Sequence, residues 1–257
     1  MNANKFIVII PARYASTRFP GKPLAKIGDK TMIERVWRQT SKAIDNVWVA
    51  TDDDRIAQEV ERFGGKVIMT SPDHPSGTDR ICEAACKVAS PVNIIINVQG
   101  DEPFIAPEQI LALKDCFSDE STSLATLVRP FPAEKGFKAL ADPNLVKVIM
   151  SENGNALYFS RSVIPFCRGV ETEDWPSKHK YFTHIGMYAY RYDTLMQIAR
   201  LSRTPLEKAE SLEQLRWLEN GLTIRTAVSE APTIGIDTPD DLRNAIDFFN
   251  QNKERYE

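Results

Sequence analysis

Short apolar runs alternate with amphipathic segments through the first half of the chain. The run from Phe6 to Ile10 is continuously apolar and rich in β-branched residues, which is typical of a strand buried on both faces. Between such runs, apolar residues recur every three or four positions, as on one face of a helix. The expected strands cover residues 6–10, 47–50, 67–69 and 94–98, and the expected helices cover about 32–44, 52–63, 78–89 and 107–117. This alternation predicts an α/β protein with a mostly parallel sheet and helices on both of its faces.

The pattern changes after about residue 120. Segments 124–128, 146–150, 156–159 and 185–190 are strand-like, and Glu152-Asn153-Gly154-Asn155 is typical of a hairpin turn. A long helix is expected from about Leu206 to Glu219, followed by a strand from Thr223 to Val228 and a final helix after Pro239. With no repeats or obvious linker, the simplest interpretation is a single domain, 1–257, with an inserted antiparallel part.

The charge balance narrows the classes of partner. The chain has 32 basic and 35 acidic side chains, a formal net charge of −3, whereas proteins that hold nucleic acid through its phosphates usually show a basic excess. No apolar stretch approaches the ~20 residues that a membrane-spanning helix needs. The polar start, Met1 to Lys5, leads straight into a strand and leaves no room for a signal peptide. We therefore expect a cytoplasmic protein that binds neither nucleic acid nor a membrane.

Cysteine is too sparse in a chain of this length to indicate a disulfide scaffold. The four cysteines are Cys82, Cys86, Cys116 and Cys167. Cys82 and Cys86 stand four residues apart on an expected helix, so they can share one face. We expect all four to be buried as small hydrophobic side chains. No C-x-x-C pair or matching histidine cluster indicates zinc.

The loop after the first strand is rich in cations. Arg13, Arg18 and Lys22 follow a buried strand directly, and Gly21 allows close approach of the backbone to a ligand. Ligands of parallel sheets bind beyond the carboxyl ends of the strands, where such cations could cradle a triphosphate. The loop is not a Walker A motif, because Ser16 replaces the leading glycine and Pro23 follows the lysine. Taken alone, it fits a solvated surface loop equally well.

Two further loops follow later strands. Ser76-Gly77-Thr78-Asp79-Arg80 opens a helix and suits an anion or the polar edge of a base, although the same residues also make an ordinary turn and N-cap. Asp101 lies just past the fourth strand. Its carboxylate is a hard oxygen ligand and could bind the Mg²⁺ that a nucleotide carries. Gln99 has an amide able to read a base. Asp237 is a second candidate ligand, or else the N-cap of the final helix.

Taken together, these loops resemble those of one family. Their motifs occur in the same order as in the 3-deoxy-manno-octulosonate (KDO) cytidylyltransferases, the CMP-KDO synthetases. The resemblance is carried by the string from Ile9 to Lys22, by the two later loops through Pro103, and by four segments of the second half. Those four segments are 158–165, 184–188, 211–216 and 235–239. The resemblance covers residues 6 to about 245. It implies a magnesium-dependent enzyme that joins CMP from CTP to KDO, releases pyrophosphate, and serves lipopolysaccharide synthesis.

The resemblance also implies a fold and a site. The fold is a Rossmann-like sheet of the nucleotide-diphospho-sugar transferase type with an antiparallel part for sugar binding and dimerisation. Residues 1–120 would bind mainly the nucleotide and 121–235 mainly the sugar and a second copy of the chain, with the apolar 158–166 region contributing to a homodimer. The nucleotide would be held by Arg13, Ser16, Arg18, Lys22, Ser76, Gly77, Thr78 and Gln99. The metal would be held by Asp101 and Asp237, which with Lys22 and Arg13 form the catalytic set. The sugar would be held by Arg161, His184, Tyr188, Glu213 and Gln214.

Three alternatives remain open at this point. The closest is a cytidylyltransferase for another acidic sugar, such as 8-amino KDO or a sialic acid. A second is a catalytically silent nucleotide-binding protein, disfavoured because binding alone does not need Asp101, Asp237, Lys22 and Arg161 together. A nucleic-acid-binding protein is disfavoured by the acidic balance. His74, His179 and residues 168–180 receive no role.

Overall fold

The computed structural model describes residues 5–15, 18–88 and 94–256. The chain forms two compact units that alternate along the sequence. The first unit comprises Met1–Leu111, Arg191–Ala199 and Pro232–Glu257, and the second comprises Ala112–Tyr190 and Arg200–Ala231. Among the described residues, no helix is both long and apolar enough to cross a membrane.

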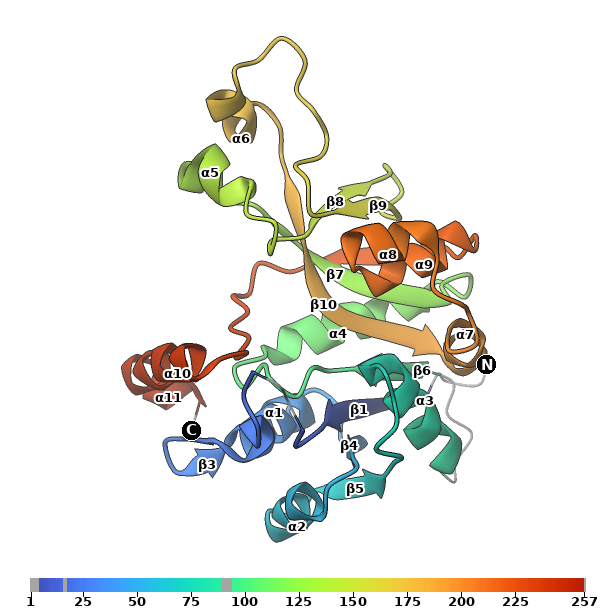
Figure 1. Ribbon diagram of the computed structural model, residues 1–257, viewed down its shortest axis with the longest axis vertical. Coiled ribbons are helices and arrows are strands. Elements are labelled where there is room, and N and C mark those ends of the chain that lie inside the picture. Colours follow the sequence, from blue (N-terminus) through green and yellow to red (C-terminus); the bar gives the residue numbers. More distant parts are fainter. Residues whose placement is uncertain (1–4, 16–17, 89–93, 257) are drawn as a thin grey trace. The chain divides into compact units, whose positions relative to one another are not determined.

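The first unit is built on a parallel sheet, as the apolar runs predict. The strands are β1 (Phe6–Ala12), β4 (Val47–Thr51), β5 (Lys66–Met69) and β6 (Ile94–Asn97). Their order is β6-β1-β4-β5, with β1 between two parallel neighbours (Figure 1). Ile7, Val8, Ile9 and Ile10 have no exposed surface, which explains why this strand is apolar at every position.

Helices connect these strands, and further helices complete the first unit. They are α1 (Met32–Ser41), α2 (Asp54–Arg62), α3 (Gly77–Lys87), α7 (Tyr192–Ile198), α10 (Pro239–Gln251) and α11 (Lys253–Tyr256). α1, α2 and α3 pack against the sheet. Another helix, α4 (Pro107–Asp115), follows β6. Side-chain oxygens cap helix starts by accepting backbone N–H bonds, as Thr31 does for α1, Asp53 for α2, Ser76 for α3 and Thr238 for α10.

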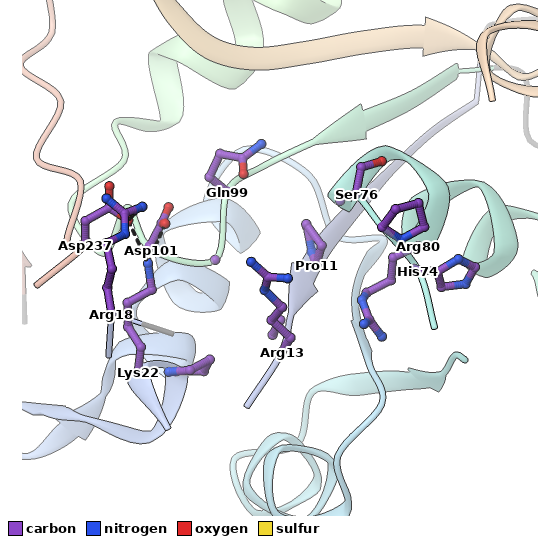
Figure 2. A pocket seen from close by; sticks show the side chains of 15 residues that line it. Pro11, Arg13, Arg18, Lys22, His74, Ser76, Arg80, Gln99, Asp101 and Asp237 are labelled. Atoms are coloured by element: carbon purple, nitrogen blue, oxygen red, sulfur yellow. Dashed lines mark hydrogen bonds and ion pairs between the residues drawn. The ribbon is translucent and has the colours of Figure 1, made fainter. Parts of the chain in front are cut away.

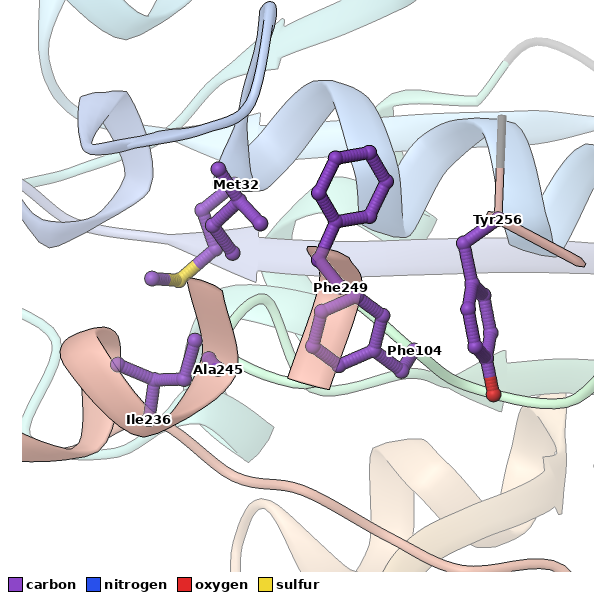
Figure 3. Packing of buried hydrophobic residues seen from close by; sticks show 7 residues of the cluster. Met32, Phe104, Ile236, Ala245, Phe249 and Tyr256 are labelled. Carbon is purple, nitrogen blue, oxygen red and sulfur yellow. The ribbon is translucent and has the colours of Figure 1, made fainter. Parts of the chain in front are cut away.

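A hydrophobic cluster ties the C-terminal helices to the N-terminal half of the first unit. Phe249 and Ala245 of α10, Tyr256 of α11 and Phe104 from the loop after β6 pack with Met32 at the start of α1 (Figure 3). Ile27 and Ile236 complete the cluster. Ile27 lies on a small antiparallel hairpin, β2 (Lys26–Ile27) and β3 (Lys30–Thr31), which the sequence did not predict. Burial of Ile236 fixes the position of the next residue, Asp237.

The second unit is largely antiparallel, in agreement with the strand-like segments after residue 120. Its strands are β7 (Leu124–Pro130), β8 (Lys147–Met150), β9 (Ala156–Ser160), β10 (Phe182–Arg191) and β11 (Arg225–Val228). β7 pairs antiparallel with β10 and parallel with β11, while β8 pairs antiparallel with β9 and β10. The register of β10 shifts between Ile185 and Tyr188.

The long helix expected from Leu206 to Glu219 is wrong. The structure has two shorter helices there, α8 (Pro205–Glu210) and α9 (Glu213–Glu219). Ser211, between them, has φ 52° and ψ 46°, the left-handed conformation that ends a right-handed helix. Because no Gly or Pro stands at this point, the sequence pattern continues through the break.

Two further helices in the second unit were also missed. α5 (Gly136–Leu140) and α6 (Trp175–Lys178) are short, and their apolar side chains Leu140 and Trp175 form a small cluster with Tyr181. Pieces of four or five residues do not show a helical period, so the hydrophobic pattern cannot reveal them.

The expected burial of the cysteines is also wrong. Cys86 is exposed, and Cys82, Cys116 and Cys167 are partly exposed. On α3 the buried face belongs to Ile81, Ala84 and Ala85. Cys82 and Cys86 therefore lie on a different face of the helix from its core residues.

Candidate functional site

A pocket of about 310 Å³ lies in the first unit, where strands of the parallel sheet end (Figure 2). Its walls come from the loops after β1, β5 and β6, the three loops that the sequence marked. Ligands of open α/β sheets bind at this edge. The lining residues are Pro11, Ala12, Arg13, Arg18, Lys22, Pro23, His74, Pro75, Ser76, Gly77, Arg80, Gln99, Gly100, Asp101 and Asp237.

One lysine brings the two candidate metal ligands together. Lys22 Nζ lies 2.7 Å from Asp101 Oδ2 and 3.4 Å from Asp237 Oδ1, and it donates a further bond of 2.7 Å to the carbonyl oxygen of Ile236. Arg18 also contacts Asp237, with its Nη2 at 3.1 Å from Oδ1. The two carboxylates, 136 positions apart in the sequence (237 minus 101), thus meet at one ammonium group.

The backbone fixes this meeting point. The N–H of Ile236 donates to the carbonyl oxygen of Asp101 at 3.0 Å, which joins the segment before α10 to the loop after β6. Gly100 lies so close to β1 that a Cβ atom there would stand 2.6 Å from the carbonyl oxygen of Pro11. Only glycine fits that approach. Asp237 is not the N-cap of α10, because Thr238 takes that position and forms a capping box with Asp241.

The two carboxylates suit a hard cation that arrives with a nucleotide. Mg²⁺ is commonly held by one or two carboxylates together with substrate phosphates. Asp101 and Asp237 keep 32% and 51% of their side-chain surface exposed, so their oxygens can be reached from the pocket. Among the described residues, no group of three or more His, Cys, Asp or Glu could hold a metal by itself. The residues therefore fit a metal shared with a phosphate ligand rather than one enclosed by protein.

The start of α3 forms the opposite wall. Ser76 Oγ accepts the N–H of Asp79 at 3.2 Å and donates to Asp79 Oδ2 at 2.6 Å, so Ser76 both caps the helix and lines the pocket. Gln99 Nε2 donates to Asn97 Oδ1 at 3.2 Å, which orients the Gln99 amide at the end of β6. Thr78, by contrast, is buried and does not line the pocket.

Arg80 lines the pocket although the sequence assigned it no separate role. It is only 3% exposed, and its guanidinium donates to Asp52 Oδ2 at 2.9 Å and to Thr70 Oγ1 at 2.5 Å. Asp52 follows β4 and Thr70 follows β5. Arg80 therefore joins α3 to the ends of two strands beneath the pocket. The sequence contained one signal for this role: Asp52 directly follows a buried strand, and a carboxylate in such a place needs a cationic partner.

His74 is the second lining residue that the sequence left without a role. Its Nε2 makes a short contact with Glu83 Oε2, and the other Glu83 oxygen pairs with Lys87 at 2.5 Å. Burial opposes ionisation of Glu83, but the bonds from Lys87, the Ser71 N–H and His74 outweigh it and lower the pKa of Glu83 to about 2. An ionised Glu83 holds the imidazole at the edge of the pocket.

Glu102, which follows Asp101 in the chain, has a raised pKa, whereas the pKa of Glu83 is lowered. Burial, and then the negative charge of Asp101, raise the pKa of Glu102 to about 7. Its Oε2 is buried and has no hydrogen-bond partner in the described part of the chain. Near neutral pH this carboxyl is partly protonated, which limits the negative charge next to Asp101.

The structure gathers most of the predicted nucleotide residues at one place. Arg13, Arg18, Lys22, Ser76, Gly77, Gln99, Asp101 and Asp237 all line the pocket. Ser16 lies outside the described residues, and the roles of all these side chains remain predictions.

The residues predicted to bind the sugar all belong to the second unit. Arg161 follows β9, His184 and Tyr188 lie on β10, and Glu213 and Gln214 begin α9. The ring centroids of His184 and Tyr188 are 5.3 Å apart, and Gln214 Nε2 is buried without a hydrogen-bond partner among the described residues.

Arg161 is held by backbone carbonyls. Its guanidinium donates to the carbonyl oxygens of Glu210 at 2.6 Å, Pro143 at 2.9 Å and Ser211 at 3.4 Å. The Arg161 N–H and Ser160 Oγ both donate to the carboxylate of Glu210. The guanidinium therefore has a fixed position at the break between α8 and α9, with no carboxylate bonded to it among these contacts.

His184 is uncharged at neutral pH. Burial lowers the pKa of His184 to about 3, and its Nε2 lies 2.9 Å from Thr126 Oγ1. Burial also raises the pKa of Tyr188 well above its usual value, so its phenol stays protonated. Both groups offer neutral hydrogen-bonding atoms, which suit the hydroxyls of a sugar better than its charge.

Comparison with known proteins gives one consistent family. A family model described as "Cytidylyltransferase" matches residues 7–224. A Bacteroides thetaiotaomicron protein named 3-deoxy-manno-octulosonate cytidylyltransferase is 56% identical over 245 residues, covering 95% of this chain and 98% of its own. A protein of the same name from Phocaeicola vulgatus is 57% identical over 247 residues, covering 96% and 98%.

Solved structures agree with the fold. A CMP:2-keto-3-deoxy-manno-octonic acid synthetase complexed with CTP has a TM-score of 0.88 at 43% identity and covers 97% of this chain and 100% of its own. A 4-diphosphocytidyl-2C-methyl-D-erythritol synthase from Anaerococcus prevotii has a TM-score of 0.60 at 14% identity, covering 96% and 99%. The second likeness shows the fold alone, and both confirm the predicted α/β class with a mostly parallel central sheet.

Proposed function

Since this chain belongs to the 3-deoxy-manno-octulosonate cytidylyltransferases, we propose that it transfers CMP from CTP to KDO, releases pyrophosphate, and uses the pocket of its first unit to hold CTP. The observation that carries this proposal is the meeting of Asp101 and Asp237 at Lys22, at the carboxyl ends of parallel strands. A lysine, two arginines and two reachable carboxylates supply the charges that a triphosphate and its metal require.

The reaction brings two anions together. The anomeric hydroxyl oxygen of the sugar attacks the α-phosphorus of CTP in line and gives up its proton to water. The bond between the α-phosphorus and the oxygen that bridges it to the β-phosphorus breaks, and pyrophosphate leaves with that oxygen. Arg13 and Lys22 offset the charge that develops on the leaving group, with Arg18 beside them. Lys22 is held on three oxygens and is 13% exposed, so its charge is fixed in place before the substrate arrives. Positioning and electrostatics account for this catalysis without a covalent enzyme intermediate.

Magnesium is the cofactor that these residues fit. Asp101 and Asp237 would hold it through their carboxylate oxygens, and the bound ion would supply positive charge to the phosphate oxygens. Lys22 orients both carboxylates at the pocket, and Arg18 contributes to the position of Asp237.

The base of CTP fits the opposite wall. Gln99 has an amide that can bond the polar edge of cytosine, while Ser76 and Gly77 present a hydroxyl and helix-start N–H groups. Arg80 supports this wall from below through Asp52 and Thr70.

The second unit would bind the sugar. Arg161 offers a fixed cation for the carboxylate of KDO, and neutral His184 and Tyr188 offer donors and acceptors for its hydroxyls, with Glu213 and Gln214 on α9. Buried, unpaired Gln214 Nε2 supports a polar partner at this place, because such groups are costly when unsatisfied.

We further propose that the enzyme is a homodimer joined through the second unit. Leu157 on β9 is 59% exposed and Phe166 is 73% exposed, both in or next to the apolar 158–166 region. Large exposed apolar side chains are candidates for an interaction surface. Analytical ultracentrifugation should show a dimer for the wild type and a monomer for Leu157→Glu/Phe166→Glu. A monomeric wild type at micromolar concentration would contradict the dimer.

In this proposal the enzyme works in the cytoplasm and its activated sugar serves lipopolysaccharide synthesis. A pyrophosphate-release assay with CTP, KDO and Mg²⁺ tests the reaction, with EDTA as the control for the metal. Parallel reactions with 8-amino KDO and a sialic acid test the sugar. Release with a sialic acid but not with KDO would overturn the proposed substrate.

A further inference from the structure

Three sulfur atoms gather between α3 and α7 in the first unit. Cys82 Sγ lies 3.4 Å from Met196 Sδ, and Cys86 Sγ lies 3.6 Å from the same atom. The two cysteines are four residues apart on α3, and Met196 lies on α7, which packs against α3. We call Cys82, Cys86 and Met196 the sulfur cluster. None of the three lines the pocket.

The sulfur cluster can be reached from solvent. Cys86 is exposed and Cys82 is partly exposed, and both carry thiols rather than a disulfide. The core-facing side of α3 is made by Ile81, Ala84 and Ala85, so the thiols are not needed to fill the core. Tyr192 of α7 places its hydroxyl 3.5 Å from Cys86 Sγ, where it can donate to a thiolate.

From this arrangement we propose that the sulfur cluster is a binding site for one soft monovalent metal ion, Cu(I). Thiolate and thioether ligands select Cu(I), whereas imidazole and carboxylate ligands favour other metals. Bonds of about 2.3 Å, the length of zinc–thiolate bonds, place neighbouring sulfurs about 4 Å apart around a three-coordinate ion. Both cysteine sulfurs lie close to the Met196 sulfur, at 3.4 and 3.6 Å, so a bound ion would move each of them outward from Met196 by about half an ångström. Met196 has three rotatable side-chain bonds and can adjust to the ion.

The same residues argue against a harder metal. Structural zinc sites use four ligands from Cys, His, Asp or Glu, and no group of three or more such residues occurs in the part of the chain that the structure describes. The third ligand of the sulfur cluster is a thioether, which zinc rarely accepts. Tyr192 is positioned as an outer partner that steadies Cys86 through a hydrogen bond.

Competition with a coloured Cu(I) chelator tests the proposal. The full-length protein, kept reduced and free of oxygen, is titrated into the Cu(I) complex of bathocuproine disulfonate, and the loss of colour gives stoichiometry and affinity. We expect one Cu(I) per chain. Cys86→Ser, at an exposed position, should lose at least about 100-fold in affinity, and Met196→Leu, of similar volume, about ten-fold.

The chain contains its own matched control. Cys116 and Cys167 are also partly exposed thiols, so Cys116→Ser/Cys167→Ser should bind Cu(I) as the wild type does. Loss of the ion in this control, or unchanged affinity in Met196→Leu, would overturn the proposal. So would displacement of Cu(I) by equimolar Zn(II). X-ray absorption should show a shell of three sulfurs, and a shell that includes nitrogen would contradict the assigned ligands.

Discussion

At the scale of single residues, the candidate site depends on one ammonium group between two carboxylates. Lys22 Nζ bonds Asp101 at 2.7 Å and Asp237 at 3.4 Å, and Arg18 also pairs with Asp237, so two cations balance the two carboxylates before any ligand binds. A phosphate or a divalent ion that enters must share or replace these contacts. The identity of each group therefore matters more than its size, because an isosteric amide has the shape of a carboxylate without its charge.

Asp101→Asn tests this dependence on charge. We expect kcat/KM to fall at least about 100-fold, because the amide cannot hold the metal and no longer balances Lys22. Pyrophosphate release across a range of Mg²⁺ concentrations is the measurement, and circular dichroism checks the fold. Asp240→Asn is the matched control, since Asp240 is exposed and pairs only with Arg243 among the bonds described. A wild-type rate for Asp101→Asn at ordinary magnesium would remove this residue from the metal site.

His184 gives a pH-dependent prediction for stability. Its folded pKa of about 3 lies below the 6.5 of the unfolded chain, so between these values the unfolded state binds more protons than the folded state. Stability from this group is present above pH 6.5 and is lost as the pH falls toward 3. Between pH 7 and pH 5 this loss is at most about 2 kcal/mol, because part of the His184 side chain is exposed and water there stabilises its charged form.

The measurement compares the wild type with His184→Gln by urea unfolding at pH 7, 6 and 5. The difference between the two proteins isolates His184 from Glu102, whose raised pKa acts in the opposite direction over the same range. We expect the wild type to lose more free energy of unfolding than the variant as the pH falls. Parallel curves for the two proteins would show that His184 titrates normally in the fold.

At the scale of elements, the sequence predicted what periodicity and loop position can reveal. The apolar run at 6–10 became β1, and the three loops after β1, β5 and β6 became the walls of the pocket. The break at Ser211 was missed because its left-handed backbone depends on local contacts, not on side-chain pattern. Arg80 and His74 were missed for a similar reason, since their partners Asp52 and Glu83 are set by the tertiary fold. The sugar residues came from family resemblance alone, because periodicity does not distinguish His184 from a structural residue.

The turn between β6 and its loop gives a prediction at this scale. Gly100→Ala would place a Cβ 2.6 Å from the carbonyl oxygen of Pro11, which is backbone and cannot rotate away. The loop must shift, and Asp101 and Gln99 move with it. We expect KM for CTP to rise at least about ten-fold and kcat to fall, because small misplacements of reacting groups are costly.

Gly235→Ala is the matched control for this turn. Gly235 also lies in a loop of the first unit and precedes Asp237 by two residues, but an added Cβ there meets nothing within 4 Å. Steady-state kinetics with CTP should therefore separate the two variants. Equal effects of both substitutions would show that loop flexibility, not the approach to Pro11, is what the enzyme requires.

At the scale of the whole molecule, the predicted roles divide between the two units. The residues predicted to bind the nucleotide and the metal lie in the first unit, and those predicted to bind the sugar lie in the second, although the units interleave along the chain. Such a division predicts that substitutions in one unit change the KM of one substrate selectively. Arg161 is the sharpest test, because three backbone carbonyls fix its guanidinium and its removal takes away a positioned cation.

Arg161→Ala should raise KM for the sugar at least about 100-fold while KM for CTP changes less than about three-fold, since charge-assisted bidentate bonds are the strong ones. Arg161→Lys keeps the charge but loses the planar fork, so we expect it to fall between the wild type and the alanine variant. Both KM values are measured by pyrophosphate release with the other substrate saturating. Thermal unfolding of each variant separates the loss of this cation from a loosened junction of α8 and α9. A variant that unfolds at the wild-type temperature and still raises both KM values equally would place Arg161 outside the sugar site and end the division of roles between the units.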